Sequence, residues 1–124
     1  MDLSQLNPAG RQVIQSYGDG GFRINGARHE GSVLVFPDAT ESWAIGAAGD
    51  LSIESLVQVV AATPKVEILV VGTGARMFAV PPVVRRHFRS VGITFEVMDT
   101  GAACRTYNVL MGDDRRVAAA LIAV

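Results

Sequence analysis

The stretch VEILVVGTG, residues 66–74, decides the fold of this chain. Residues 66–71 are nearly all apolar and rich in β-branched side chains, a pattern typical of a strand that is covered on both faces. The strand runs directly into Gly72-Thr73-Gly74, where glycine permits a tight turn and a close approach of the backbone. The pattern predicts the central strand of a sheet, followed by a short loop at its carboxyl end.

Helices and strands alternate downstream of this stretch. Apolar residues at helical spacing predict helices over 81–91 and 100–112, with Val84, Phe88 and Val91 facing inward in the first and Ala103, Tyr107 and Leu110 in the second. A strand is expected between them at 93–98, and residues 116–124 are interpreted as a closing strand, although their alanines would also suit a helix. This order predicts parallel strands with right-handed crossovers, so the loops at 72–74 and 99–101 should leave the same edge of the sheet.

Shorter apolar segments precede the deciding stretch. Strands are expected at 13–17, 22–25, 32–36 and 40–45, the first two joined by a glycine turn. Ser52 can cap a helix that ends before Pro64 and buries a face made of Ile53, Leu56, Val57, Val60 and Ala61.

Composition indicates one compact domain. The chain has 124 residues, of which 49% are hydrophobic and 19% charged, enough to bury a single core. We expect an N-terminal arm over residues 1–12 and one α/β domain over 13–124. The net charge of −1 gives no general attraction to nucleic acid. We expect no cofactor, no metal site and no transmembrane segment, since no apolar run approaches the length that spans a bilayer.

The two exit loops are the candidate binding site. Amides at Gly72-Thr73-Gly74 and a hydroxyl at Thr100 could line a small pocket beyond the carboxyl ends of the strands. The loop lacks the third glycine of a dinucleotide fingerprint and the lysine of a P-loop. The alternative interpretations are a plain tight turn and, for Thr100, a helix cap. Asn108, expected in mid-helix, should need a hydrogen-bond partner.

No catalytic set is assembled by the remaining polar residues. Cys104 could be activated by the dipole of a helix start, but a buried structural cysteine is the favoured interpretation. His29, in a glycine-flanked loop, and His87 are expected to be solvated, and Asp113-Asp114 is expected to form a turn. The arginines of the second helix, Arg85, Arg86 and Arg89, could meet an acidic partner or form a solvated face.

Together, several motifs resemble the Mth-type domain family, which includes mitochondrial respiratory complex I assembly factors and an adipogenesis-associated protein. The likeness covers nearly everything after Val13 and rests on GFRING at 21–26, Trp43, VEILVVGTG at 66–74, MDT at 98–100, TYNVL at 106–110 and the closing segment 115–122. It implies a three-layer α/β fold with a mixed central sheet, whose final strand runs antiparallel to the others. Asp113-Asp114 depart from the Glu-Gly that the family often shows before the arginine matched by Arg115.

The resemblance also carries expectations about function. It implies a family without an established reaction, whose mitochondrial branch helps to assemble NADH:ubiquinone oxidoreductase by binding protein partners. We therefore expect a cytoplasmic, bacterial-type assembly factor that binds protein partners, with respiratory or export machinery of the membrane as candidates. The alternative is a small-molecule-binding protein or an enzyme of unknown reaction. Its pocket rim, at positions that match the family motifs or adjoin them, would comprise Gly72, Thr73, Gly74, Asp99, Thr100, Thr106, Tyr107 and Asn108.

Overall fold

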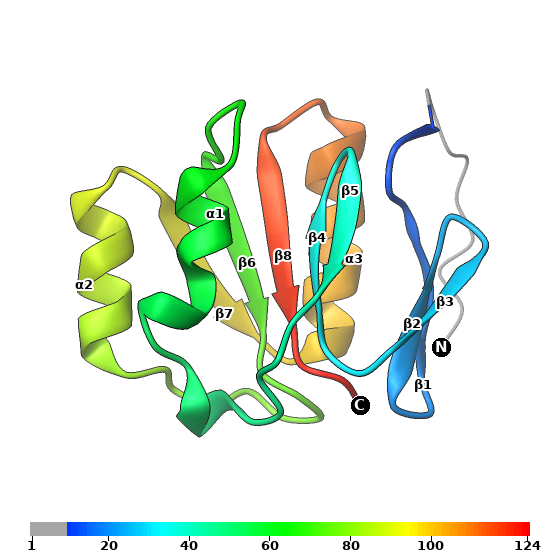
Figure 1. Cartoon of the computed structure of the whole chain (residues 1–124), viewed down its shortest axis with the longest axis horizontal. Helices are drawn as coiled ribbons and strands as arrows, with labels where there is room; N and C mark the ends of the chain where they lie inside the picture. The colour runs from blue at the N-terminus through cyan, green and yellow to red at the C-terminus, as the bar shows by residue number, and fades with distance from the viewer. Residues whose placement is uncertain (1–9) are drawn as a thin grey trace.

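The computed structural model describes residues 10–124 and contains two sheets and three α-helices (Figure 1). The smaller sheet holds β1 (Ile14–Gly18), β2 (Gly21–Ile24) and β3 (Ala27–Glu30). The larger holds β4 (Val33–Phe36), β5 (Ala39–Ser42), β6 (Ile68–Gly72), β7 (Thr94–Met98) and β8 (Val117–Leu121). The helices are α1 (Val57–Ala61), α2 (Pro82–Ser90) and α3 (Thr100–Gly112), and 3-10 turns lie at Ala48–Asp50 and Glu54–Leu56. The predicted α/β class with a mixed sheet is confirmed.

The larger sheet has the order β5-β4-β8-β6-β7, so β8 is its central strand. The expectation that residues 66–71 form the central strand is therefore wrong by one position. The expectation that the final strand is antiparallel to the others holds on one side only, since β8 is antiparallel to β4 but parallel to β6. The reason is the crossover through α3, which returns the chain in the direction of β6 and β7.

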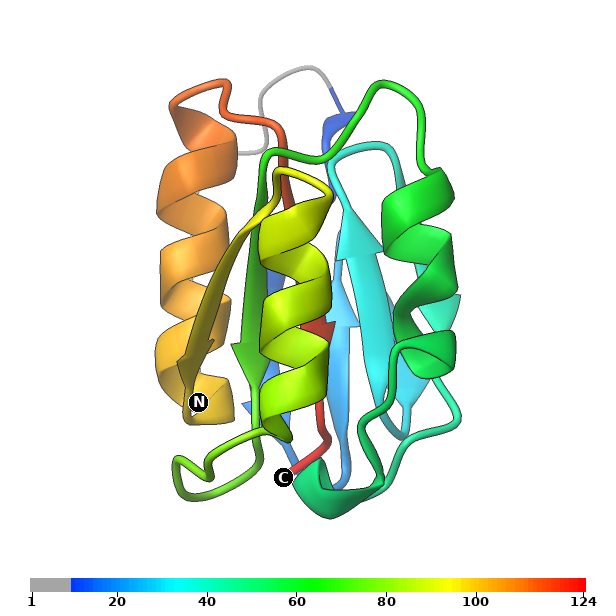
Figure 2. The ribbon, with the colours of Figure 1, turned by 90° about the vertical axis from the view of Figure 1, so that its left-hand side faces the viewer.

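Layers of different composition cover the two faces of the larger sheet. Helices α1 and α2 cover one face, and α3 with the small sheet covers the other (Figures 1 and 2). Side chains of β6 point alternately to the two faces. Leu69 and Val71 belong to the apolar cluster on the α1 and α2 side, and Ile68 and Val70 to the cluster on the α3 side. The fold thus has two cores separated by one sheet.

Helix α2 begins and ends where its sequence signals predict. Pro82 occupies the first turn, and Gly92, with φ +77°, follows the last turn in the left-handed conformation. Val84 and Phe88 are buried as expected. The Phe88 ring lies 5.2 Å from the Phe95 ring, centre to centre, so α2 packs against β7.

The helix expected after Ser52 is shorter than predicted and buries a different face. Ser52 and Ser55 each accept a hydrogen bond from the other's backbone N–H group, as in a capping box, but a 3-10 turn precedes α1. A 3-10 turn has three residues per turn, which shifts the buried face. As a result Leu56 and Val59 are buried, whereas Val57 and Val60 are 58% and 37% exposed.

Strand β3 was not predicted, and it holds His29, which was expected in a loop. Three of the four residues at 27–30 are polar and three are exposed, so the segment lacks the apolar alternation of a half-buried strand. The available signal was Asn25-Gly26, both of which adopt positive φ, at 49° and 80°. This dipeptide is typical of a two-residue hairpin turn and connects β2 to β3.

Candidate functional site

The two exit loops meet at one end of the larger sheet. Thr100 donates its backbone N–H to the carbonyl of Gly74 at 2.8 Å, and its Oγ1 accepts the Gly74 N–H at 2.9 Å. The same hydroxyl donates to the carbonyl of Ile122 at 2.7 Å. Thr100 is fully buried, so its side chain ties β6, α3 and the C-terminal segment together rather than facing solvent.

Gly72 lies where β6 approaches α3 most closely. A Cβ atom placed on Gly72 would lie 2.8 Å from the Thr100 Cα and 3.1 Å from the Ala103 Cβ. Both distances are shorter than ordinary van der Waals contact. The first glycine of the loop therefore permits packing between strand and helix, and this accounts for it without a ligand.

Thr73 organises the loop that follows. It is 3% exposed, and its hydroxyl accepts the Phe78 N–H at 3.0 Å and lies 2.7 Å from the Arg76 carbonyl oxygen, to which it donates. These bonds close residues 73–78 into a compact turn. Met77 and Phe78 nevertheless remain 61% and 56% exposed, and Val83 in the first turn of α2 is 50% exposed. We call Met77, Phe78 and Val83 the apolar tip.

Asp99, not Thr100, caps α3. Asp99 has an extended backbone and its side chain accepts the Ala102 N–H at 2.9 Å, whereas the hydroxyl of Thr100 is used by Gly74 and Ile122. A cap must precede the first helical residue, and Thr100 is already inside the helix.

Three further rim candidates join α3 to other elements. Asn108 bonds both backbone groups of Ile14, accepting the N–H at 3.0 Å and donating to the carbonyl at 2.8 Å, which is the partner its buried position requires. Tyr107 donates its hydroxyl to the Gln12 carbonyl at 2.8 Å, and burial raises the pKa of this phenol. Thr106 is half-buried, with its hydroxyl 3.4 Å from the Met98 sulfur. Tyr107 and Asn108 therefore attach the N-terminal part of the described chain to α3.

The N-terminal arm expected over 1–12 falls outside the described residues as far as residue 9. Within the described part, Arg11 forms an ion pair with Asp114 at 2.7 Å, and Gln12 donates its N–H to the Pro37 carbonyl at 2.9 Å.

The buried position of Cys104 agrees with a structural role. Burial is the largest cause that raises its thiol pKa to about 12, so the thiol is protonated at neutral pH. His87 packs edge-on against Phe88. Within residues 10–124, no group of three or more His, Cys, Asp or Glu side chains is arranged to hold a metal ion. No helix in this part of the chain is long and apolar enough to cross a membrane.

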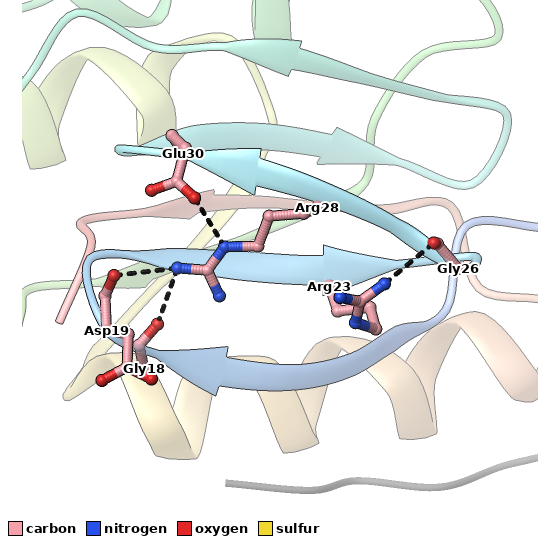
Figure 3. Close-up of polar contacts among 6 residues, drawn as sticks. All are labelled: Gly18, Asp19, Arg23, Gly26, Arg28 and Glu30. Carbon is pink, nitrogen blue, oxygen red and sulfur yellow. Dashed lines mark hydrogen bonds and ion pairs between the residues drawn. The ribbon is translucent and has the colours of Figure 1, made fainter.

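The small sheet contains the GFRING segment and a network around Arg28 (Figure 3). Arg28 donates to the carbonyls of Gly18 and Asp19 at 3.2 and 2.8 Å and to the Glu30 carboxylate at 2.8 Å. The hydrogen bond from Arg28 lowers the pKa of Glu30. Arg23 donates to the Gly26 carbonyl at 3.0 Å. These arginines bind the turns of their own sheet and are not free for a ligand.

The arginines of α2 have a different environment. Among the described residues, neither Arg85, Arg86 nor Arg89 forms an ion pair. The Arg85 guanidinium lies 5.6 Å from the centre of the Phe95 ring, a cation–π arrangement. A groove of about 420 Å³ runs beside them, lined by Arg85, Arg89, Gly92, Ile93, Thr94 and Phe95.

A second hollow, of about 370 Å³, lies among residues that include Arg11, Phe36, Pro64, Val66 and Arg116. Its two arginines already pair with acidic groups, Arg11 with Asp114 and Arg116 with Glu67. Of these two hollows, only the α2 groove contains arginines that form no ion pair among the described residues. The arginines of α2 were predicted from the sequence as a candidate partner surface, but the groove also needs residues of β7, which were not predicted as part of it.

Comparisons with known proteins give a consistent result. Residues 14–122 match the family described as "Protein of unknown function (DUF498/DUF598)". "NADH dehydrogenase [ubiquinone] 1 alpha subcomplex assembly factor 3" of Xenopus tropicalis is 41% identical over 109 residues, which are 88% of this chain and 60% of that protein. The chain thus spans about 60% of the length of this relative.

Solved structures agree with the fold. An outer membrane protein from Bartonella henselae matches with a TM-score of 0.85 and 36% identity, covering 93% of this chain and 97% of that one. A Bordetella pertussis protein described as a Mth938-like domain matches with a TM-score of 0.81 and 28% identity, covering 98% and 92%.

Proposed function

The chain belongs to the DUF498/DUF598 family and has the Mth938-like fold, and from this premise we propose that it is an assembly factor that acts by binding a protein partner. The relatives that carry a functional name are called assembly factors of NADH dehydrogenase. By analogy, the partner of this chain is a subunit of a respiratory membrane complex, met on its cytoplasmic side.

The observation that carries this proposal is the apolar tip. Large apolar side chains that are more than half exposed cost free energy in water unless another surface covers them. Met77 and Phe78 stand next to each other on a loop that the buried Thr73 hydroxyl holds in place. A fixed loop loses little conformational entropy on binding, which favours a protein contact at this position.

The rim expected to hold a small molecule gives weaker support to the alternative. The side-chain hydroxyls of Thr73 and Thr100 are already bonded to backbone groups of the protein. A ligand at this point would have to break those bonds.

Affinity purification of the full chain from native extract tests the proposal. We compare the wild-type chain with the double variant Met77→Ser/Phe78→Ser, using Val57→Ser/Val60→Ser as the matched control because these valines are also exposed. Subunits of a membrane complex should be captured by the wild-type and control chains. The tip variant should lose at least about tenfold in captured partner, which corresponds to about 1.4 kcal/mol.

Circular dichroism confirms that each variant is folded before capture is compared. Equal capture by all three chains would contradict the role of the tip. Recovery of the protein alone, in repeated purifications, would contradict binding altogether.

A further inference from the structure

Strand β7 ends the larger sheet, and its outer side is not paired with any strand of the described chain. Thr94 donates its N–H to the Glu67 carbonyl at 2.9 Å, and the Met98 carbonyl accepts the Thr73 N–H at 2.9 Å. Backbone groups alternate sides along a strand, so positions 94, 96 and 98 face β6. The N–H and C=O groups of Phe95 and Val97 consequently point outward. Figure 2 looks onto this side and shows β7 between α3 and α2.

The two faces of β7 carry opposite charges, with Arg85 on one and Glu96 on the other. Phe95 and Val97 pack toward the core beneath α1 and α2, and Arg85 lies over the Phe95 ring. Thr94 and Glu96 are exposed on the opposite face, where alternation places them on the α3 side. A strand laid beside β7 would therefore have arginines near one face and a carboxylate near the other.

The groove along α2 places arginines beside this edge. It is lined by Arg85 and Arg89 together with Thr94 and Phe95, so both arginines lie beside the start of the free edge. Neither arginine has an acidic partner within residues 10–124. Arginine binds carboxylates through two parallel hydrogen bonds, which gives both attraction and geometry.

We propose that β7 takes up an extended acidic segment of the partner as an added strand. The segment pairs its backbone with Phe95 and Val97 and places carboxylates, at every second position, against Arg85 and Arg89. Its intervening residues lie beside Thr94 and Glu96 and are not acidic, because like charges across neighbouring strands repel. This inference rests on the proposed protein-binding function and specifies the chemistry of the partner.

Peptide titration of the ¹⁵N-labelled full chain tests strand addition directly. The probe, called the alternating peptide, is an acetylated and amidated octapeptide in which glutamate and threonine alternate. It is compared with a block peptide of the same composition and charge, in which all the glutamates precede all the threonines. We expect the alternating peptide to slow hydrogen exchange of the Phe95 and Val97 amides and to bind at least tenfold more tightly than the block peptide. Binding should weaken as salt is added, because the ion pairs are partly exposed.

A matched pair of charge reversals tests the arginines. Arg89→Glu should raise the Kd for the alternating peptide at least tenfold. Arg115→Glu changes net charge equally at an exposed position that is not among the groove residues, and should leave the Kd within twofold of wild type.

Several outcomes would overturn the inference. Equal affinity for the two peptides would mean that only net charge attracts them. Unchanged hydrogen exchange of the Phe95 and Val97 amides would exclude strand addition. If the chain self-associates without peptide and Arg89→Glu abolishes this association, the β7 edge binds a second copy of the chain instead. If Arg89→Glu still captures the native partner in full, the assembly-factor proposal stands while the acidic-strand inference fails. If no partner is captured by any chain, it is the assembly-factor proposal that fails.

Discussion

At Gly72 the main chain of β6 approaches α3 so closely that no side chain fits between them. The contact is made by Thr100, whose hydroxyl bridges Gly74 and Ile122. Asn108 performs a similar task farther along α3, where its amide satisfies both backbone groups of Ile14. Single buried polar residues thus fix the relative positions of strands and helix. Their hydrogen-bonding groups are already bonded to the backbone of the protein.

Replacement of Gly72 by alanine tests this close approach. The new Cβ would lie 2.8 Å from the Thr100 Cα, so backbone must move. Overpacking of this kind costs about 1–3 kcal/mol and should lower the Tm by roughly 4–12 °C. Gly112→Ala is the control, since nothing lies within 4 Å of its added Cβ. Thermal unfolding measures the Tm of the two variants. Equal Tm values would contradict a close approach of β6 and α3 at Gly72.

Alkaline pH should destabilise the protein through Cys104. Burial raises the thiol pKa from 9.0 to about 12, so the folded chain keeps a proton that the unfolded chain releases. The stabilisation is complete below pH 9 and is lost as the pH rises toward 12. The buried phenol of Tyr107 shifts in the same direction.

Urea unfolding at several pH values between 8 and 11 measures this loss. Cys104→Ala should be less stable than wild type at pH 8 but should show a shallower decline above pH 9. An identical pH slope in both chains would mean that the thiol does not contribute.

Among the elements, those whose periodicity and end signals coincide could be predicted from the sequence. Helix α2 has an apolar face together with Pro82 and Gly92, and α3 begins next to Asp99. The face of α1 could not be predicted, because a 3-10 turn changes its phase. Strand β3 carries no apolar alternation, so only its Asn25-Gly26 turn marked it.

The candidate site was predictable only in part, for a reason of topology. The arginines of α2 and the meeting of the two exit loops follow from local patterns and parallel strands. That β7 is an edge depends on β8 returning between β4 and β6. Strand order is set by contacts distant in sequence, and no local pattern encodes it.

The loop at residues 73–78 should loosen when Thr73 is replaced by valine. Valine keeps the shape but removes the hydroxyl that accepts the Phe78 N–H. One hydrogen bond contributes about 1 kcal/mol, so hydrogen exchange at the Phe78 amide should accelerate roughly five- to tenfold. NMR-detected exchange measures this. Thr106→Val is the control, since the Thr106 hydroxyl bonds the Met98 sulfur and not the loop, and it should leave exchange at the Phe78 amide unchanged. Similar acceleration in both variants would contradict the role of the Thr73 hydroxyl in holding the loop.

On the scale of the whole molecule, polar groups inside the fold are satisfied while one side remains open to a partner. Among the described residues, no buried side-chain nitrogen or oxygen lacks a hydrogen-bond partner. The apolar tip precedes α2 and continues into it, the unpaired arginines lie on α2, and the free strand edge is β7, next to α2. Figure 2 faces this side of the molecule. A protein surface that combines these three features fits a partner better than it fits a small metabolite.

Site-specific photo-crosslinking tests this central claim most directly. The photoreactive residue p-benzoylphenylalanine replaces Phe78 in the apolar tip, the exposed Thr94 of β7 or Arg23 on the small sheet, and each chain is irradiated in native cells. We predict that positions 78 and 94 form adducts with the same partner protein and that position 23 forms none. Adducts from position 23 alone, or from no position, would contradict the account.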